Sequence, residues 1–219
     1  VSKPFSYSGT VRYINLPTSS YISYITEAIN KWGKCRTGAI TMYGAGVGVY
    51  GNSGYAYTGS TPSKLKKRIE EANSSNAEIT DINITENGNY VIILGGSGYW
   101  TLGYPDAFLK KLEQYRTGDL RDDNILSACF NDRGEWVVIT DKHYSYSNET
   151  IKNFILKAEE LYEEVYYAYI TNYGMIACCK NGVYYKNIPS NLAEALKKLT
   201  FKPKVIKFTD NGLYLITDG

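Results

Sequence analysis

The chain has 219 residues, 43% of them hydrophobic, and its 24 Lys and Arg residues against 22 Asp and Glu residues give a net charge of +2. A charge this balanced does not draw in a phosphate backbone from a distance, so we expect no nucleic-acid partner. No apolar run approaches the roughly 18 residues of a membrane-spanning helix, so we expect no membrane partner. The length and the hydrophobic content suffice for one domain with a substantial core.

A five-fold internal repeat organises the chain. Each repeat opens with a short aromatic strand, such as Tyr55-Ala56-Tyr57 or Tyr144-Ser145-Tyr146. Dividing the chain before each of these strands gives five repeat units, which are 1–52, 53–96, 97–141, 142–180 and 181–219.

After the aromatic strand, each unit continues into a helix with a single apolar stripe. Pro followed by a small polar residue is a typical helix start, and Asn148 takes this place in the fourth unit. The expected starts are Pro17, Pro62, Pro105, Asn148 and Pro189. The expected stripes are Ile22, Ile25, Ile29 and Trp32; Leu65, Ile69 and Ala72; Phe108, Leu109, Leu112 and Tyr115; Ile151, Ile155, Ala158 and Tyr162; and Leu192, Leu196 and Leu199.

The second half of each unit is predicted to be two strands around a tight turn. Asn87-Gly88 and Asn211-Gly212, each between apolar residues in alternation, are strong hairpin signals. The first unit has sequences typical of the two strands, but its run from Met42 to Val49 has no clear turn signal. A second Gly-rich turn leads into the aromatic strand of the next unit, so each sheet is predicted to be a three-stranded meander whose third strand belongs to the following repeat.

The two ends of the chain complement each other. The last unit stops after its second strand, whereas the chain begins with an aromatic strand that follows no hairpin. We therefore predict that residues 5–8 pair with residues 213–217 and that five strand-helix-strand-strand units close into an α/β repeat toroid, because closure leaves no unpaired strand edge. The alternative is an open five-unit stack.

Known catalytic and metal-binding patterns do not stand out. His143 is the only histidine, and we interpret it as a turn residue. The four cysteines (Cys35, Cys129, Cys178 and Cys179) lack the spacing of a disulfide framework, and we interpret them as buried thiols. The acidic residues beside the hairpin glycines lack calcium-loop spacing, and no helix follows the glycine run at 44–48 as a dinucleotide fold requires. We therefore expect no cofactor and no metal.

The compartment has two interpretations. Val1 at the start is consistent with a processed, secreted protein, and glycosylation sequons begin at Asn73, Asn83 and Asn148. Sequons also arise by chance, and Asn83 falls within a predicted strand. We expect secretion, with a cytoplasmic location as the alternative.

Aromatic residues are the remaining functional signal, with 22 Tyr and 3 Trp in the chain. Tyr and Trp combine an apolar ring face with a polar group, which suits stacking on a sugar ring. We expect a non-enzymatic, multivalent protein that binds a glycan or another small polar ligand, like a lectin, through Tyr57, Trp100, Tyr146 and Tyr185. The alternative is that these aromatic residues belong to the core.

The order strand-helix-strand-strand, repeated over the whole chain, resembles the plan of the pentein or α/β-propeller toroids. Pentein enzymes that modify guanidino groups use a Cys nucleophile, a His and acidic residues at one mouth of the ring. The resemblance implies an alternative activity, a guanidino-modifying hydrolase or transferase, in which His143 with Cys178 or Cys179 would be recruited. A structural scaffold is the third possibility, and we assign no catalytic residue.

Overall fold

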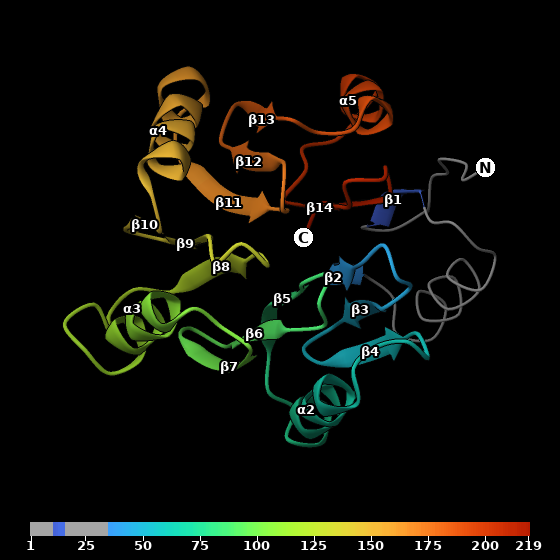
Figure 1. The fold of residues 1–219 in the computed structure, drawn as a ribbon, viewed down its shortest axis with the longest axis vertical. Helices are drawn as coiled ribbons and strands as arrows, with labels where there is room; N and C mark the ends of the chain where they lie inside the picture. The colour runs from blue at the N-terminus through green and yellow to red at the C-terminus, as the bar shows by residue number, and fades with distance from the viewer. Residues whose placement is uncertain (1–10, 16–34) are drawn as a thin grey trace. The chain divides into compact units, whose positions relative to one another are not determined.

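The described part of this computed structural model, residues 11–15 and 35–219 with side chains from residue 35 onward, contains five small antiparallel sheets of three strands each (Figure 1). In four of the sheets the strands follow one another along the chain, in the orders β2-β3-β4, β5-β6-β7, β8-β9-β10 and β11-β12-β13. The fifth has the order β1-β15-β14. The predicted three-stranded meander is confirmed for these four sheets.

The chain divides into two compact units, residues 1–79 with 188–219 and residues 80–187. The first unit contains β1 (Val11–Asn15), β2 (Cys35–Ile40), β3 (Gly46–Tyr50), β4 (Gly54–Tyr57), α2 (Ser63–Ser74), α5 (Ser190–Lys197), β14 (Val205–Phe208) and β15 (Tyr214–Thr217). The second contains β5 (Ile79–Ile84, whose first residue belongs to the first unit), β6 (Tyr90–Leu94), β7 (Gly98–Leu102), α3 (Asp106–Arg116), β8 (Ile125–Phe130), β9 (Trp136–Thr140), β10 (Tyr144–Tyr146), α4 (Glu149–Tyr162), β11 (Val165–Ile170), β12 (Met175–Cys179) and β13 (Gly182–Lys186).

The described helices begin where the sequence predicts. Pro62, Pro105 and Pro189 are the residues immediately before α2, α3 and α5. Asn148 caps α4, since its side-chain oxygen accepts a hydrogen bond from the Ile151 amide at 2.9 Å. The helix start at Pro17 and the stripe Ile22, Ile25, Ile29 and Trp32 lie outside the described residues.

Helix α3 fills the space between two consecutive sheets. Its buried residues Phe108, Leu112 and Tyr115 share one core cluster with side chains of β6, β8 and β9. The Phe108 ring lies 5.2 Å from that of Phe130 and 6.0 Å from that of Trp136, centroid to centroid. A three-stranded sheet cannot bury both of its faces alone, so the helix supplies the missing apolar surface.

Three of the predicted helix stripes need correction. In α5 the buried residues are Leu192 and Ala195, whereas Leu196 and Leu199 are half-buried. In α4 the stripe includes Phe154, whose ring stacks on Tyr184 of β13 at 4.9 Å. The predicted stripe residues Leu109 of α3 and Tyr162 of α4 are half-buried. These differences reflect the sheet that each helix meets, which the helical period alone does not specify.

A buried carboxylate joins the first strands of the three sheets in the second unit. Asp81 of β5 is fully buried. Its Oδ1 accepts a hydrogen bond from the Tyr167 hydroxyl of β11 at 2.8 Å, and its Oδ2 accepts bonds from the Ala128 amide of β8 and the Asn83 side chain, both at 3.1 Å. Asn83 is buried, and its side-chain amide also donates a hydrogen bond to the Ala128 carbonyl at 2.7 Å.

The strand that completes the last sheet is β1. It runs antiparallel to β15, with Ile14 opposite Leu215 and Asn15 opposite Tyr214. The prediction of residues 5–8 in this role was wrong, and those residues lie outside the described range. The aromatic pattern predicted the wrong residues for this strand, because β1, with the sequence VRYIN, has a single aromatic residue.

In the part of the chain that the structure describes, no helix combines the length and the apolar character needed to cross a membrane.

The packing of α3 gives a first prediction. Leu112→Ala should lower the free energy of unfolding by about 2–5 kcal/mol, since it removes a fully buried side chain. Lys110→Ala, on the exposed face of the same helix, should stay within about 0.5 kcal/mol of the unaltered protein. Urea denaturation measures both, and equal losses would show that the buried face of α3 is assigned incorrectly.

The pairing of β1 gives a second prediction. Deleting residues 1–15 should lower the free energy of unfolding by about 2 kcal/mol or more, because β15 is buried and would lose hydrogen-bond partners on one edge. Deleting residues 1–9 removes no part of β1 and serves as the control. Thermal melting of the two truncated proteins checks this, and identical melting curves would contradict the role of β1.

Candidate ligand-binding site

The hairpin turn has one plan in four of the five described sheets, in which the amide of the first turn residue donates to the carbonyl four residues later. Asn131 begins the β8–β9 turn, and its side-chain oxygen accepts hydrogen bonds from the amides of Arg133 and Glu135, both at 3.0 Å. Gly134 follows with a φ of 79°, a conformation that favours glycine. Thr85 and Thr209 accept hydrogen bonds from turn amides in the same way, with Gly88 and Gly212 three residues later. The β11–β12 turn is one residue shorter: the Thr171 amide donates to the Gly174 carbonyl at 2.9 Å, and the Thr171 hydroxyl oxygen accepts the amides of Tyr173 and Gly174.

The first repeat follows this plan more closely than its sequence suggests. The Thr41 amide donates to the Ala45 carbonyl at 3.1 Å, and Gly44 has a φ of 100°. Gly44 is thus the turn glycine, equivalent to Gly88 and Gly134. The interpretation that this unit lacks a clear turn was wrong, because Met42 and Tyr43 occupy positions that are usually polar in such a turn.

Hydrogen bonds fasten the β8–β9 turn to the β11–β12 turn. The Asn131 side chain donates to the Thr171 carbonyl at 3.0 Å. The Asp132 amide donates to the Asn172 side-chain oxygen, and the Arg133 guanidinium donates to the Asn172 carbonyl, both at 3.1 Å. The two turns therefore form one rigid edge.

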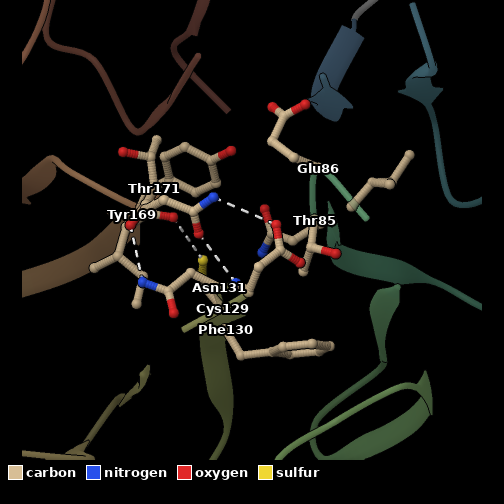
Figure 2. Close-up of a pocket in the computed structure, with 12 residues that line it drawn as sticks. Thr85, Glu86, Cys129, Phe130, Asn131, Tyr169 and Thr171 are labelled. Atoms are coloured by element: carbon tan, nitrogen blue, oxygen red, sulfur yellow. Dashed lines mark hydrogen bonds between the residues drawn. The ribbon is translucent and has the colours of Figure 1, made fainter. Parts of the chain in front are cut away.

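A small pocket lies where the first strands of the three sheets of the second unit end (Figure 2). Thr85 and Glu86 approach it from one side, Tyr169 and Thr171 from the other, and Asn131 lies between them. Its volume of about 20 Å³ has room for about one water molecule. This pocket is too small for an organic ligand.

A larger cavity of about 230 Å³ shares Asn131, Thr171 and Asn172 with the small pocket. Its walls are the β8–β9 turn with Arg133 and Glu135, the β11–β12 turn with Tyr173, the first turn of α4 with Thr150, and the end of β13 with Lys186. The Tyr173 side chain is 72% exposed. The cavity therefore combines hydrogen-bonding groups with an accessible aromatic ring.

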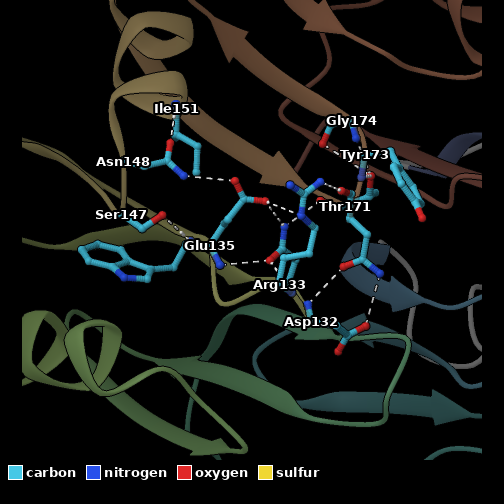
Figure 3. A network of polar contacts seen from close by, with 12 residues as sticks. Asp132, Arg133, Glu135, Ser147, Asn148, Ile151, Thr171, Tyr173 and Gly174 are labelled. Atoms are coloured by element: carbon cyan, nitrogen blue, oxygen red, sulfur yellow. Dashed lines mark hydrogen bonds and ion pairs between the residues drawn. The ribbon is translucent and has the colours of Figure 1, made fainter.

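Glu135 holds the turn against the start of α4 (Figure 3). Its Oε1 accepts a hydrogen bond from the Asn131 side chain at 3.0 Å, and its Oε2 accepts one from the Asn148 side chain at 3.0 Å. Asn148 is also the N-cap of α4, where its side-chain oxygen accepts a hydrogen bond from the Ile151 amide. This network orders the wall of the cavity in advance, which lowers the entropic cost of binding.

The predicted stacking residues do not all share one position. Tyr57, Tyr146 and Tyr185 lie opposite Val47, Val137 and Ile176, each the second residue of its middle strand. Trp100 lies opposite Ile92, one residue further along, so Thr101 is the residue equivalent to Tyr57. Adjacent strand residues point to opposite faces, so Trp100 lies on the other face of its sheet.

These residues also differ in exposure and partners. Tyr185 is 38% exposed, whereas Tyr57, Trp100 and Tyr146 are half-buried. The Tyr57 hydroxyl donates to Glu70 of α2 at 2.7 Å, and its ring contacts the Lys66 ammonium group at 5.3 Å.

Tyrosine-to-glutamate bonds between a third strand and the following helix recur in three repeats. Tyr57 donates to Glu70, Tyr99 to Glu113, and Tyr144 to Glu159. The hydrogen bond to Glu70 raises the pKa of Tyr57 to about 12. Burial, with the glutamate partner as a further cause, raises the pKa of Tyr99 and of Tyr144 to about 12. These phenols stay protonated at neutral pH and stabilise the contact between strand and helix.

The groups needed for guanidino chemistry are poorly placed. Cys35, Cys129, Cys178 and Cys179 are buried free thiols, as predicted. Burial raises the pKa of Cys178 and raises that of Cys35 to about 12, the opposite of what a nucleophilic thiol requires.

His143 lies in the β9–β10 turn, with Nδ1 2.6 Å from buried Asp123 and its amide bound to Thr140. Asp123 also accepts a hydrogen bond from the Thr140 hydroxyl, so the Asp123 carboxylate links both ends of the β9–β10 turn. Within the described ranges, no three His, Cys, Asp or Glu side chains gather in a way that could hold a metal ion.

Four residues of the cavity, Arg133, Asn172, Tyr173 and Lys186, were not predicted to be functional. The available signal was the large aromatic residue Tyr173 between Asn172 and Gly174, two residue types that are typical of turns. Comparison with known protein families and with curated protein sequences finds no match for this chain.

The Tyr57–Glu70 bond gives a third prediction. Glu70→Gln should lower the pKa of Tyr57 from about 12 toward its ordinary value of about 10, because the negative charge beside the phenol is removed. Since the folded-state pKa is raised, the stability that this bond contributes is present below about pH 10 and is lost as the pH rises through about 12. NMR titration of ring-labelled tyrosine measures the shift. Glu71→Gln, which changes the charge one residue away, should leave Tyr57 unaffected.

Proposed function

We propose that the protein binds glycans or similar small polar ligands without catalysis, and that the cavity beside Tyr173 is a primary site. The observation that carries this proposal is the position of an exposed tyrosine ring next to a preordered cavity lined by Asn, Thr, Arg and Glu side chains. A sugar ring presents an apolar C–H face and a rim of hydroxyl groups, and this lining complements both.

The size of the cavity favours a small ligand. Pockets for drug-sized molecules have volumes of about 300–1,000 Å³, so about 230 Å³ suits one sugar ring rather than a buried chain. The cavity is open to solvent at Tyr173, which lets the rest of a glycan extend outward. Such a site binds weakly on its own.

Multivalent binding through Tyr57, Trp100, Tyr146 and Tyr185 is part of the same proposal. Tyr185 is the strongest of these candidates, because it is the most exposed of the four. Several weak sites on one chain would raise the avidity for a branched or repetitive glycan.

We further propose that the five repeats close into a toroid, as in α/β-propellers. The pairing of β1 with β15 supports this arrangement, because the two ends of the chain share one sheet. Secretion accords with the exposed sequon residue Asn73. Asn83 is not a suitable glycan acceptor, because its side chain is buried and bound to Asp81 and the Ala128 carbonyl.

Glycan-array binding, followed by calorimetry on the best ligand, tests the proposal and is the fourth prediction. Tyr173→Ala should weaken binding by about tenfold or more, since loss of a stacking platform costs about 1–3 kcal/mol. Tyr173→Phe keeps the ring and should retain most of the affinity.

Tyr104→Ala removes another exposed tyrosine of the same unit, away from the cavity, and is the matched control. If the unaltered protein binds no glycan on the array, the proposed function is wrong. If it binds but Tyr173→Ala has no effect, the ligand occupies a different site.

A further inference from the structure

Two cationic side chains line the cavity without a full set of partners. Arg133 donates through Nη1 to the Asn172 carbonyl at 3.1 Å and faces Glu135 through Nε at 3.5 Å. These contacts orient the guanidinium group and leave Nη2 without a partner among the described residues. Lys186, exposed at the end of β13, likewise has no carboxylate partner in the described part of the chain.

One carboxylate, that of Glu135, is present in the cavity lining as far as the structure describes it. Each of its oxygens accepts a hydrogen bond from an asparagine side chain. Glu149, at the start of α4, pairs with Lys152 at 3.5 Å and points to solvent. Asp132 lines the small pocket instead, where Asn172 lies 3.4 Å from its Oδ2.

The described lining therefore carries two cationic side chains and one carboxylate, which lies beside Arg133. The first turn of α4 adds to this field, because the N-terminal end of a helix bears a partial positive charge. Because Glu135 balances one of the two cations, a neutral ligand would leave one positive charge of the lining unbalanced, whereas an oxyanion would engage the free guanidinium nitrogen and the ammonium group together.

Building on the function proposed above, we propose that this cavity selects an acidic sugar. The oxyanion of the sugar binds between Arg133 and Lys186, while the ring lies against Tyr173. The shared chemistry is a negatively charged oxygen group on a pyranose ring, which a uronic acid provides as a carboxylate and a sugar phosphate as a phosphate. A guanidinium group donates hydrogen bonds to the oxygens of either anion, so the test includes both sources.

The experiment compares matched neutral and acidic sugars by calorimetry on the full chain. The probes are glucose with glucuronate and glucose 6-phosphate, and galactose with galacturonate. At least one acidic member should bind about tenfold more tightly than its neutral partner, the size expected for a charge-assisted hydrogen bond at an exposed site. Raising the salt concentration should reduce this difference.

Single substitutions test whether Arg133 and Lys186 cause the preference for an acidic sugar. Arg133→Gln and Lys186→Gln should each reduce the binding of the acidic sugar toward that of the neutral sugar and change the affinity for the neutral sugar by less than about threefold. Tyr173→Ala should weaken both classes alike. Lys157→Gln is the control for charge, because Lys157 lies on α4 outside the cavity and pairs with Glu160. Thermal melting confirms that each variant folds.

The outcomes separate this inference from the proposed function. If neutral and acidic sugars bind equally well, the acidic preference is wrong and the glycan-binding function stands. If the preference is present but persists in both cation variants, the assignment of the oxyanion to Arg133 and Lys186 is wrong. If no sugar binds at all, the proposed function fails, and the inference fails with it.

Discussion

The second unit depends on the buried carboxylate of Asp81. A fully buried carboxylate is costly unless several donors satisfy it. Asp81 obtains one donor from Asn83 on its own strand and two from β8 and β11, which are distant in sequence. Any shift of β8 or β11 against β5 would leave the carboxylate short of a donor. The requirement to satisfy this one group therefore fixes how the three sheets meet, and it aligns the ends of their first strands.

The candidate site follows from that alignment. Because β8 and β11 end at the same level, their turns lie close enough for Asn131 and Arg133 to bind the backbone of the β11–β12 turn. The cavity forms between this rigid edge and the start of α4. Its lining is thus a consequence of how neighbouring sheets pack, and no single repeat contains it.

This explains which features were predictable. Local signals predicted the helix starts, the Asn-Gly hairpins and the three-stranded sheets, because each depends on a few neighbouring residues. The role of Asp81 was hidden in the run from Ile79 to Ile84, where alternating polar residues normally indicate a solvent-facing side. In β5 that side packs against other strands, so both faces are buried. The cavity was equally hidden, since its residues come from four separate elements.

The tyrosines show why composition alone was an uncertain guide to function. Tyr57, Tyr99 and Tyr144 use their hydroxyl groups to bind helix glutamates, so they hold helices to strands. Tyr173 differs, because it lies in a turn with its ring exposed beside a polar cavity. A structural tyrosine and a ligand-binding tyrosine have the same side chain. They differ in whether other residues of the protein already pack on the ring and hydrogen-bond the hydroxyl group. Tyrosines such as Tyr57, Tyr99 and Tyr144 therefore contribute to the packing of helices on strands, and a tyrosine count does not by itself indicate a binding site. What favours binding is an exposed ring beside a polar cavity.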